Sequence, residues 1–316
     1  MANQTFISTF LLLKFSEIQE LQILHFLVFL VFYLTTVAEN LLIIAAIMLD
    51  RHLHTPMYFF IINLAVLDLG TVSTIIPKSM INSLTNYGSI SYSGCVAQVF
   101  FMFFFASSAF TLLTAMAYDR YVAICNPLQY NRIMHKRSCI QIAAIAWIVS
   151  LINTSLQTGG TFAIPFCSNI VHQFFCEIPS LLKLSCSDVN LVEVGLLTFS
   201  CCLGIGCFIF IIITYMQILS TVLKIPSTHG QKKALYTCFP HLVVVSLYTS
   251  TALFAYARPP SDAFSDMDVV FAVLYTMIPP MLNPLIYSMR NKDIKNALWR
   301  LLAFGCFSKT LFGFVL

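Results

Sequence analysis

A pair of opposite charges stands out within an apolar stretch of the sequence. Residues 115–125 read AMAYDRYVAIC and place Asp119 beside Arg120, although charged residues make up only 9% of the chain. Neighbouring residues on a helix do not face each other, so at least one of the two should find a partner on another helix. The pair predicts a latch between helices that a conformational change could break. The alternative is that both side chains simply reach the edge of a membrane.

Other polar residues interrupt apolar runs elsewhere in the chain. Polar groups inside a membrane are costly and usually face the interior of a helix bundle. We therefore expect Glu39, Asn40, Asp68 and Asn283 to form a network that joins the first, second and seventh apolar runs. The alternative is that each is tolerated separately. Pro284 removes a backbone donor and kinks the last run, which leaves Asn283 free to bond sideways.

The sequence does not support catalytic or metal chemistry. His25, His172 and His241 have no carboxylate or Cys at a catalytic spacing, and no HExxH occurs. The 11 Cys include no CxxC pair and no metal-like cluster with His. The formal charge of +4 is modest, which argues against a nucleic-acid partner. We expect no enzymatic activity, no metal and no cofactor.

Composition identifies the surroundings of these residues as lipid. Hydrophobic residues make up 59% of the 316 residues, and charged residues make up only 9%. Soluble domains carry about 25% charged residues. A bilayer is crossed by roughly 20 apolar residues, which must be helical because lipid offers no partner to the backbone. The sequence predicts an all-α membrane protein, a bundle of seven transmembrane helices in contact with membrane lipid. The predicted spans are 24–49, 56–84, 94–124, 139–159, 194–223, 234–257 and 269–288, with a long connection at 160–193.

The basic residues predict the orientation of the bundle. Of the 17 Lys and Arg, only Lys14, Lys78, Lys183 and Arg258 fall on one side of the predicted membrane, and the other 13 fall on the opposite side. The side rich in basic residues is cytoplasmic. We expect a plasma-membrane protein with residues 1–23 extracellular, 24–288 forming the bundle and 289–316 cytoplasmic. The last segment is expected to form an amphipathic helix with one apolar face, formed by Ile294, Leu298, Leu301 and Leu302.

Two further patterns agree with that orientation. Asn3 begins a glycosylation sequon, which is useful only outside the cell. A second sequon at Asn153 lies within the fourth span, and we reject it. Disulfides persist outside the cell, and four cysteines fall on the predicted outer side, where three pairings are open. They are Cys95, Cys167, Cys176 and Cys186.

Several motifs in order resemble those of a known family over nearly the whole chain. They are LHTPMYFF at 53–60, MAYDRYVAICNPLQY at 116–130, KALYTCFPHL at 233–242 and PMLNPLIYSMRN at 280–291. With seven spans and an external N-terminus, the chain closely resembles olfactory receptors of the rhodopsin-like G-protein-coupled class. The segment FFCEIPSLLKLSC at 174–186 looks like the second external loop of that family.

The resemblance implies roles in signalling. Arg120, in a motif with Asp119 and Tyr121, would contact a heterotrimeric G protein once the sixth span swings outward, and Asp119 would restrain it at rest. Tyr215 and Tyr287 match tyrosines that rearrange on activation, beside Asn283 and Pro284. The G protein would be of the stimulatory olfactory type, which raises cyclic AMP. The resemblance also implies disulfides Cys95–Cys176 and Cys167–Cys186, with Cys95–Cys186 as the competing assignment.

The resemblance further implies a ligand pocket between the outer halves of spans three, five, six and seven. Its mostly apolar residues with a few hydroxyls suit a small, neutral, volatile or hydrophobic ligand. Met102 stands where receptors for amines carry an acidic residue, which disfavours a cationic amine ligand. Residues 269–289 contain no Lys, which excludes a Schiff base with retinal there. The matching positions are Val99, Met102, Phe103, Ala106, Ser107, Phe199, Ser200, Leu203, Thr249, Ala252, Leu253, Tyr256, Val273 and Thr276.

The sequence departs from the family pattern at several places, including Tyr236 and Pro240, where Ser is common. Glu39 stands where Gly is usual, Ala109 where Glu is usual, and Tyr248-Thr249-Ser250 where Phe-Tyr-Gly is usual. We hypothesise that Glu39 partly replaces the missing carboxylate of span three, as a cation ligand near Asp68. The competing functional interpretations are a non-olfactory receptor of the same class and a transporter. An internal repeat, which transporters often contain, is not evident.

Overall fold

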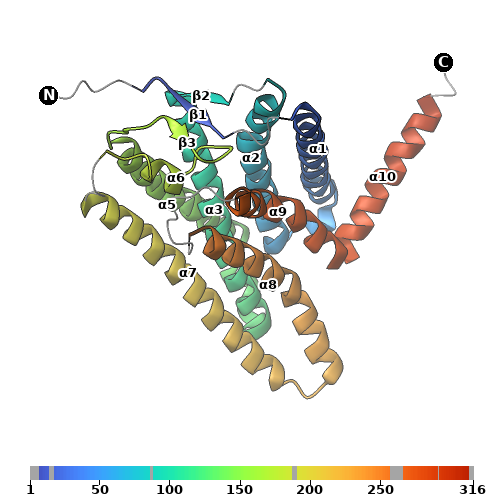
Figure 1. Cartoon of the computed structure of the whole chain (residues 1–316). Coiled ribbons are helices and arrows are strands. Elements are labelled where there is room, and N and C mark those ends of the chain that lie inside the picture. Colours follow the sequence, from blue (N-terminus) through green and yellow to red (C-terminus); the bar gives the residue numbers. More distant parts are fainter. Residues whose placement is uncertain are drawn as a thin grey trace.

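Seven long helices form the body of the molecule (Figure 1). The computed structural model describes residues 7–13, 18–85, 88–186, 191–256, 266–290 and 292–312. Within them the seven helices contain 25 to 34 residues each, or about 38–51 Å at 1.5 Å per residue, which exceeds the roughly 30 Å of bilayer hydrocarbon. They are α1 (Gln19–Leu49), α2 (Pro56–Thr85), α3 (Tyr92–Cys125), α5 (Lys136–Phe162), α7 (Leu191–Leu223), α8 (Thr228–Tyr256) and α9 (Asp266–Arg290). The predicted seven-helix bundle is confirmed.

The outer surfaces of these helices are apolar and face lipid. Within the described residues, α1, α2, α3, α5 and α7 are each long and apolar enough to cross a membrane. In α7 only 6% of the most apolar window is buried inside the protein. So much exposed apolar surface is compatible with lipid and not with water. The helices extend beyond the predicted spans, because α1 begins at Gln19 and α3 at Tyr92, outside the apolar runs.

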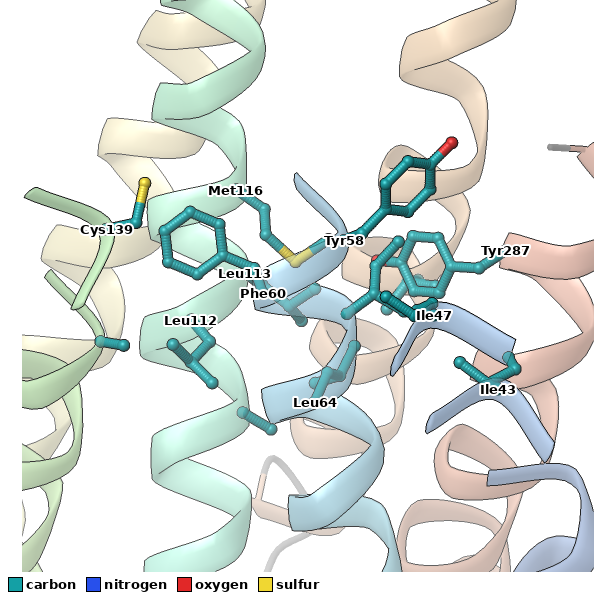
Figure 2. Close-up of a cluster of buried hydrophobic side chains, with 14 of the residues drawn as sticks. Ile43, Ile47, Tyr58, Phe60, Leu64, Leu112, Leu113, Met116, Cys139 and Tyr287 are labelled. Carbon is teal, nitrogen blue, oxygen red and sulfur yellow. The ribbon is translucent and has the colours of Figure 1, made fainter. Parts of the chain in front are cut away.

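The principal core lies where α1, α2, α3 and α9 meet. Figure 2 shows Phe60 and Leu64 of α2 packed towards Leu112 and Met116 of α3, with Tyr287 of α9 at the edge of the cluster. All five side chains are buried. This packing fixes the depth of α3 relative to its neighbours, and α3 carries the Asp119–Arg120 pair.

A small sheet covers one end of the bundle (Figure 1). Strand β1 (Thr9–Leu12) lies between β2 (Ser89–Ser91), which is antiparallel to it, and β3 (Ile170–Val171), which is parallel. Gly88 is required beside β1, because a Cβ atom there would lie 2.4 Å from the carbonyl oxygen of Leu12. The sequence did not predict this sheet, since strands of two to four residues have no readable periodicity.

Short elements connect the helices at the opposite end. They are the 3-10 helices η1 (Arg51–Leu53) and η2 (Pro127–Gln129) and the helical turn α4 (Tyr130–Ile133), while α6 (Ile178–Leu182) lies in the long connection after α5. The final helix α10 (Lys292–Phe312) buries Ile294 and Ala297. Arg300 of α10 forms an ion pair with Asp50 at the end of α1. The first turns of α10 are therefore packed against the bundle, and the predicted position of this helix on the membrane surface stays a prediction.

Candidate functional site

One disulfide ties the loop between α5 and α7 to the start of α3, and a second disulfide lies within the loop itself. Cys95 at the start of α3 is bonded to Cys176, and Cys167 is bonded to Cys186. This is the pairing that the family resemblance implied, and not Cys95–Cys186. Gln98 of α3 holds the same loop, because its Oε1 accepts the backbone N–H of Cys176 at 2.9 Å. The loop is thus fixed to α3 by one covalent and one polar contact.

Part of the predicted ligand set lies beneath this loop and not beside open space. Phe174 and Phe175 of the loop are buried and form a cluster with Met102 of α3. Val99 is fully buried in a second cluster that includes Cys176. In this structure both α3 residues therefore support the loop.

One turn further along α3, a residue of the predicted ligand set is exposed. Ala106 is exposed although it lies in the middle of the helix. It lies seven residues before Leu113, on the same helical face, and the Leu113 carbonyl meets α8. Ser107 is half-buried beside it. Ala106 is therefore an exposed position on the face of α3 that this spacing turns towards α8.

A polar network connects α5 to α7 near that level. Ser200, which the resemblance assigns to the ligand, donates to Oδ1 of Asn153 at 2.7 Å and accepts from Nε2 of Gln157 at 2.7 Å. Its hydroxyl is therefore engaged in a contact between helices. Asn153 is buried within α5, as expected from the rejection of its sequon. Asn3 lies outside the described residues.

The other predicted ligand residues differ in accessibility. Phe199 and Leu253 are 48% and 61% exposed, whereas Thr276 is buried and donates to the Ala272 carbonyl at 2.6 Å. The side chains of Ala252 and Tyr256 are outside the described part of the structure. Those that are half-buried are Phe103, Leu203, Thr249 and Val273.

A buried carboxylate in the loop was missed from the sequence. Glu177 accepts hydrogen bonds from Ser180 at 2.7 Å and from the hydroxyl of Tyr275 in α9. It links the loop to the helix that carries Val273 and Thr276. Its position in the predicted external loop gave no signal, because carboxylates in external loops are usually solvated.

Asp68 is the centre of a polar network in the middle of the bundle. Nδ2 of Asn283 donates to its two carboxylate oxygens at 2.9 and 3.2 Å, and the hydroxyl of Tyr248 donates to Oδ1 at 3.2 Å. These bonds join α2, α9 and α8. The sequence predicted the contact between Asp68 and Asn283, whereas the contribution of Tyr248 from α8 was not foreseen.

Asn40 compensates for a proline in α9. Because Pro284 has no N–H, the carbonyl four residues earlier, that of Pro280, loses its helical partner. Nδ2 of Asn40 donates to this carbonyl at 3.2 Å and also to Thr36 at 2.9 Å. Asn40 is fully buried and so connects α1 to the kinked helix.

Glu39 does not join these contacts. Successive residues on a helix point about 100° apart, so Glu39 is turned away when Asn40 faces the interior. Glu39 is half-buried, and it has no hydrogen bond within the described residues. The proposed pairing of Glu39 with Asp68 is therefore absent from this conformation. The hydrogen-bonded network around Asp68 joins α2, α8 and α9, and Asn40 connects α1 to α9 separately through the Pro280 carbonyl.

At the opposite end of α3, Asp119 is held by a loop residue. The hydroxyl of Tyr130, the first residue of α4, donates to Oδ1 of Asp119 at 2.8 Å. Asp119 is only 2% exposed. Burial and the negative charge of Asp119 raise the pKa of Tyr130 well above its ordinary range, so this hydroxyl remains a donor. Asp119 does have a partner away from Arg120, but on the short loop helix instead of another span.

Arg120 lies within electrostatic range of residues on three other helices, α7, α8 and α9. Its charge acts on Tyr215 of α7 and Tyr287 of α9. Tyr215 is hydrogen-bonded to Nδ1 of His241 in α8 at 2.7 Å, and Nε2 of His241 lies 2.9 Å from the Leu113 carbonyl. A carbonyl can only accept, so Nε2 carries the proton and Nδ1 of the neutral ring accepts from Tyr215. His241 thereby joins α3, α7 and α8. His241 lies in the family-like motif KALYTCFPHL, but the sequence did not predict that it joins these three helices.

Comparison with known proteins identifies relatives for this arrangement. Residues 29–304 match the family described as Olfactory receptor. Human Olfactory receptor 14I1 is 52% identical over 302 residues, covering 95% of this chain and 97% of the relative. Human Olfactory receptor 14A2 is 49% identical over 303 residues, covering 96% of each. The crystal structure of squid rhodopsin has a similar fold, with a TM-score of 0.72 and 16% identity, covering 90% of this chain and 82% of that one.

Proposed function

We propose a function from the premise that this chain belongs to the olfactory receptor family. It is a multi-pass membrane receptor with the rhodopsin fold and is not an enzyme. The family implies a small ligand and a G protein as partners. The proposal concerns where the ligand binds, how the signal crosses the bundle and which G protein receives it.

The ligand binds in the outer half of the bundle, in the space next to Ala106. Ser107 and Thr249 are half-buried hydroxyl residues of the predicted ligand set, and most other members of that set are apolar. A small neutral odorant would gain affinity from apolar burial, at about 25 cal/mol per Å², and would be oriented by one or two hydrogen bonds. The loop held by Cys95–Cys176 lies over the outer end.

The signal passes to the opposite end through α3 and α8. The observation that carries this proposal is the grouping of Arg120 with Tyr215 and Tyr287 while Asp119 is bound by Tyr130. Outward movement of α8 would break the contact of His241 with Leu113 and expose Arg120 to a G protein. We assign this partner to the stimulatory olfactory type, so that odorant binding raises cyclic AMP.

The orientation follows from the distribution of charge. The N-terminus with Asn3 is proposed to be extracellular and glycosylated, and α10 to lie at the cytoplasmic surface. The disulfide-bonded loop and the three-stranded sheet lie at the end where α3 begins, opposite the end where α1 finishes and Arg300 of α10 contacts Asp50. This supports the orientation because disulfides persist outside the cell.

An odorant screen tests the function directly. The receptor is expressed with the stimulatory olfactory G protein, its surface amount is measured by antibody, and cyclic AMP is recorded against a broad odorant panel. We expect a concentration-dependent response that Arg120→Ala abolishes while surface delivery persists. If the receptor reaches the surface and no odorant raises cyclic AMP, the odorant–cyclic AMP proposal is wrong. If Arg120→Ala signals normally, the role of Arg120 is wrong.

A further inference from the structure

A groove on the lipid-facing side of the bundle lies apart from both the proposed ligand site next to Ala106 and the residues around Arg120. Its volume is about 390 Å³, within the roughly 300–1,000 Å³ of ligand pockets. It lies at the end of the bundle proposed to be cytoplasmic, between the end of α1, the start of α2 and the start of α5. The lining residues are Ile47, Met48, Leu53, His54, Thr55, Pro56, Phe59, Ile62, Met134, Lys136, Cys139 and Ile140.

The walls of the groove are suited to a hydrocarbon chain. Ile47, Leu53 and Met134 are buried and form its floor. Met48 and Ile140 are 63% and 49% exposed at its rim. Because these rim residues belong to membrane-spanning helices, the groove opens towards lipid and not towards the interior of the bundle.

The polar end of the groove is basic. Lys136 lines it and, with Arg137, occupies the first turn of α5. A helix N-terminus carries a partial positive charge, so two bases there are unfavourable without an anion. His135 provides no side-chain cap for this turn, and no acidic residue lies in it. The first turn therefore presents backbone N–H groups and two cationic side chains together.

The nearby carboxylates do not neutralise this charge. Asp50 is paired with Arg300, and Asp119 is bound by Tyr130. Within the described part of the chain, neither Lys136 nor Arg137 forms an ion pair. The apolar groove thus ends in an unneutralised basic site at the level of the lipid headgroups.

We propose that this groove binds an anionic phospholipid of the inner leaflet. The phosphate would lie at the N-terminus of α5 beside Lys136, and an acyl chain would lie along Met48 and Ile140. The cytoplasmic leaflet is rich in such lipids. Met134 of the groove donates its N–H to the Tyr130 carbonyl at 2.8 Å, so a bound lipid would brace the turn that holds Asp119.

Photolabelling of the full-length receptor tests the proposal. The receptor is placed in phosphatidylcholine nanodiscs with a trace of phosphatidylserine that carries a diazirine on one acyl chain. Labelled peptides are mapped by mass spectrometry, with unlabelled phosphatidylserine, phosphatidylcholine or cholesterol as competitor. We expect labelling concentrated on residues 47–62 and 134–140 and displaced by phosphatidylserine alone. Labelling spread evenly over all spans, or displaced by cholesterol and not by phosphatidylserine, overturns the proposal.

Paired variants separate the headgroup from the chain. Lys136→Gln and Arg137→Gln should each lower labelling about fivefold, the effect of one basic residue near an anionic surface, whereas Lys224→Gln, an exposed base at the end of α7, should not. Ile140→Trp should block the groove, whereas Ile145→Trp, at a 61% exposed position on the same helix, should not. Equal labelling of variants and controls refutes the site. The amount of each variant at the cell surface shows whether it folds. If a variant does not fold, the competition between labelled and unlabelled lipids on the wild-type receptor decides the question.

Discussion

The hydrogen bond between Tyr130 and Asp119 offers the most direct test of the proposed resting latch. Tyr130→Phe removes one hydroxyl and keeps the ring, so the packing of α4 should persist. The bond measures 2.8 Å, and its acceptor is a carboxylate only 2% exposed. Because little water can replace the lost donor, Asp119 should become less well held in the resting conformation.

The expected size of the effect follows from the charge of the acceptor. A hydrogen bond to a charged group contributes about 1.5–3 kcal/mol, and about 1.4 kcal/mol is a tenfold change in an equilibrium. If the bond exists only at rest, Tyr130→Phe shifts the balance towards the active state by about tenfold or more. Basal cyclic AMP should then rise before any odorant is added.

A double-mutant cycle in the cyclic AMP assay distinguishes a latch from a packing effect. Tyr130→Phe, Asp119→Asn and the double variant are compared at equal surface amounts. Tyr33→Phe is the matched control, because it removes a hydroxyl bonded to Ser73 on an exposed face. A specific latch requires that the two substitutions are not additive. Unchanged basal cyclic AMP in Tyr130→Phe, or strict additivity, would refute the reasoning.

Three further predictions concern the ligand space, the central network and pH. Ala106→Phe should fill the open space and abolish the odorant response at normal surface delivery, whereas Ala144→Phe on the exposed face of α5 should leave dose–response curves unchanged. Asp68→Asn should weaken the odorant response about tenfold, because the hydrogen bonds from Asn283 and Tyr248 lose their charged acceptor. The loss costs about 1–3 kcal/mol. An unchanged dose–response curve would argue against the network. The raised pKa of Tyr130 keeps its hydroxyl protonated, so its stabilising bond is lost only as pH rises through that raised pKa. The difference in basal cyclic AMP between the wild type and Tyr130→Phe should therefore stay constant between roughly pH 6 and 9, and a difference that shrinks within this range would contradict the prediction.

Much of the fold was predictable because lipid leaves the backbone few options. Runs of about 20 apolar residues must be helical in a membrane, and seven such runs gave the seven long helices. The sheet formed by β1, β2 and β3 was not predictable, because pairing between distant short segments leaves no local pattern. The start of α1 at Gln19 was missed for a related reason, since a helix continues in water after its apolar run has ended.

The sequence named individual residues for the candidate site, but the contacts that these residues make were harder to predict. The rule that Asp119 and Arg120 cannot face each other correctly required an outside partner, yet nothing local pointed to Tyr130 in the loop. Glu39 and Asn40 are adjacent and polar, and only the rotation of α1 decides which of them faces the interior. In the sequence, Tyr248 cannot be distinguished from the apolar residues around it. Only the packing of α8 brings its hydroxyl to Asp68.

The spacing of residues on α3 explains how the two ends of the receptor could be coupled. Ala106, Leu113 and Arg120 are separated by seven residues each and lie along one face of the helix. At the midpoint His241 of α8 bonds to the Leu113 carbonyl, so α8 cannot move away from α3 without leaving this buried N–H unpaired, at a cost of about 1–3 kcal/mol. A ligand beside Ala106 acts on the same α3–α8 interface. Coupling therefore requires only that the ligand be better accommodated when that contact is open.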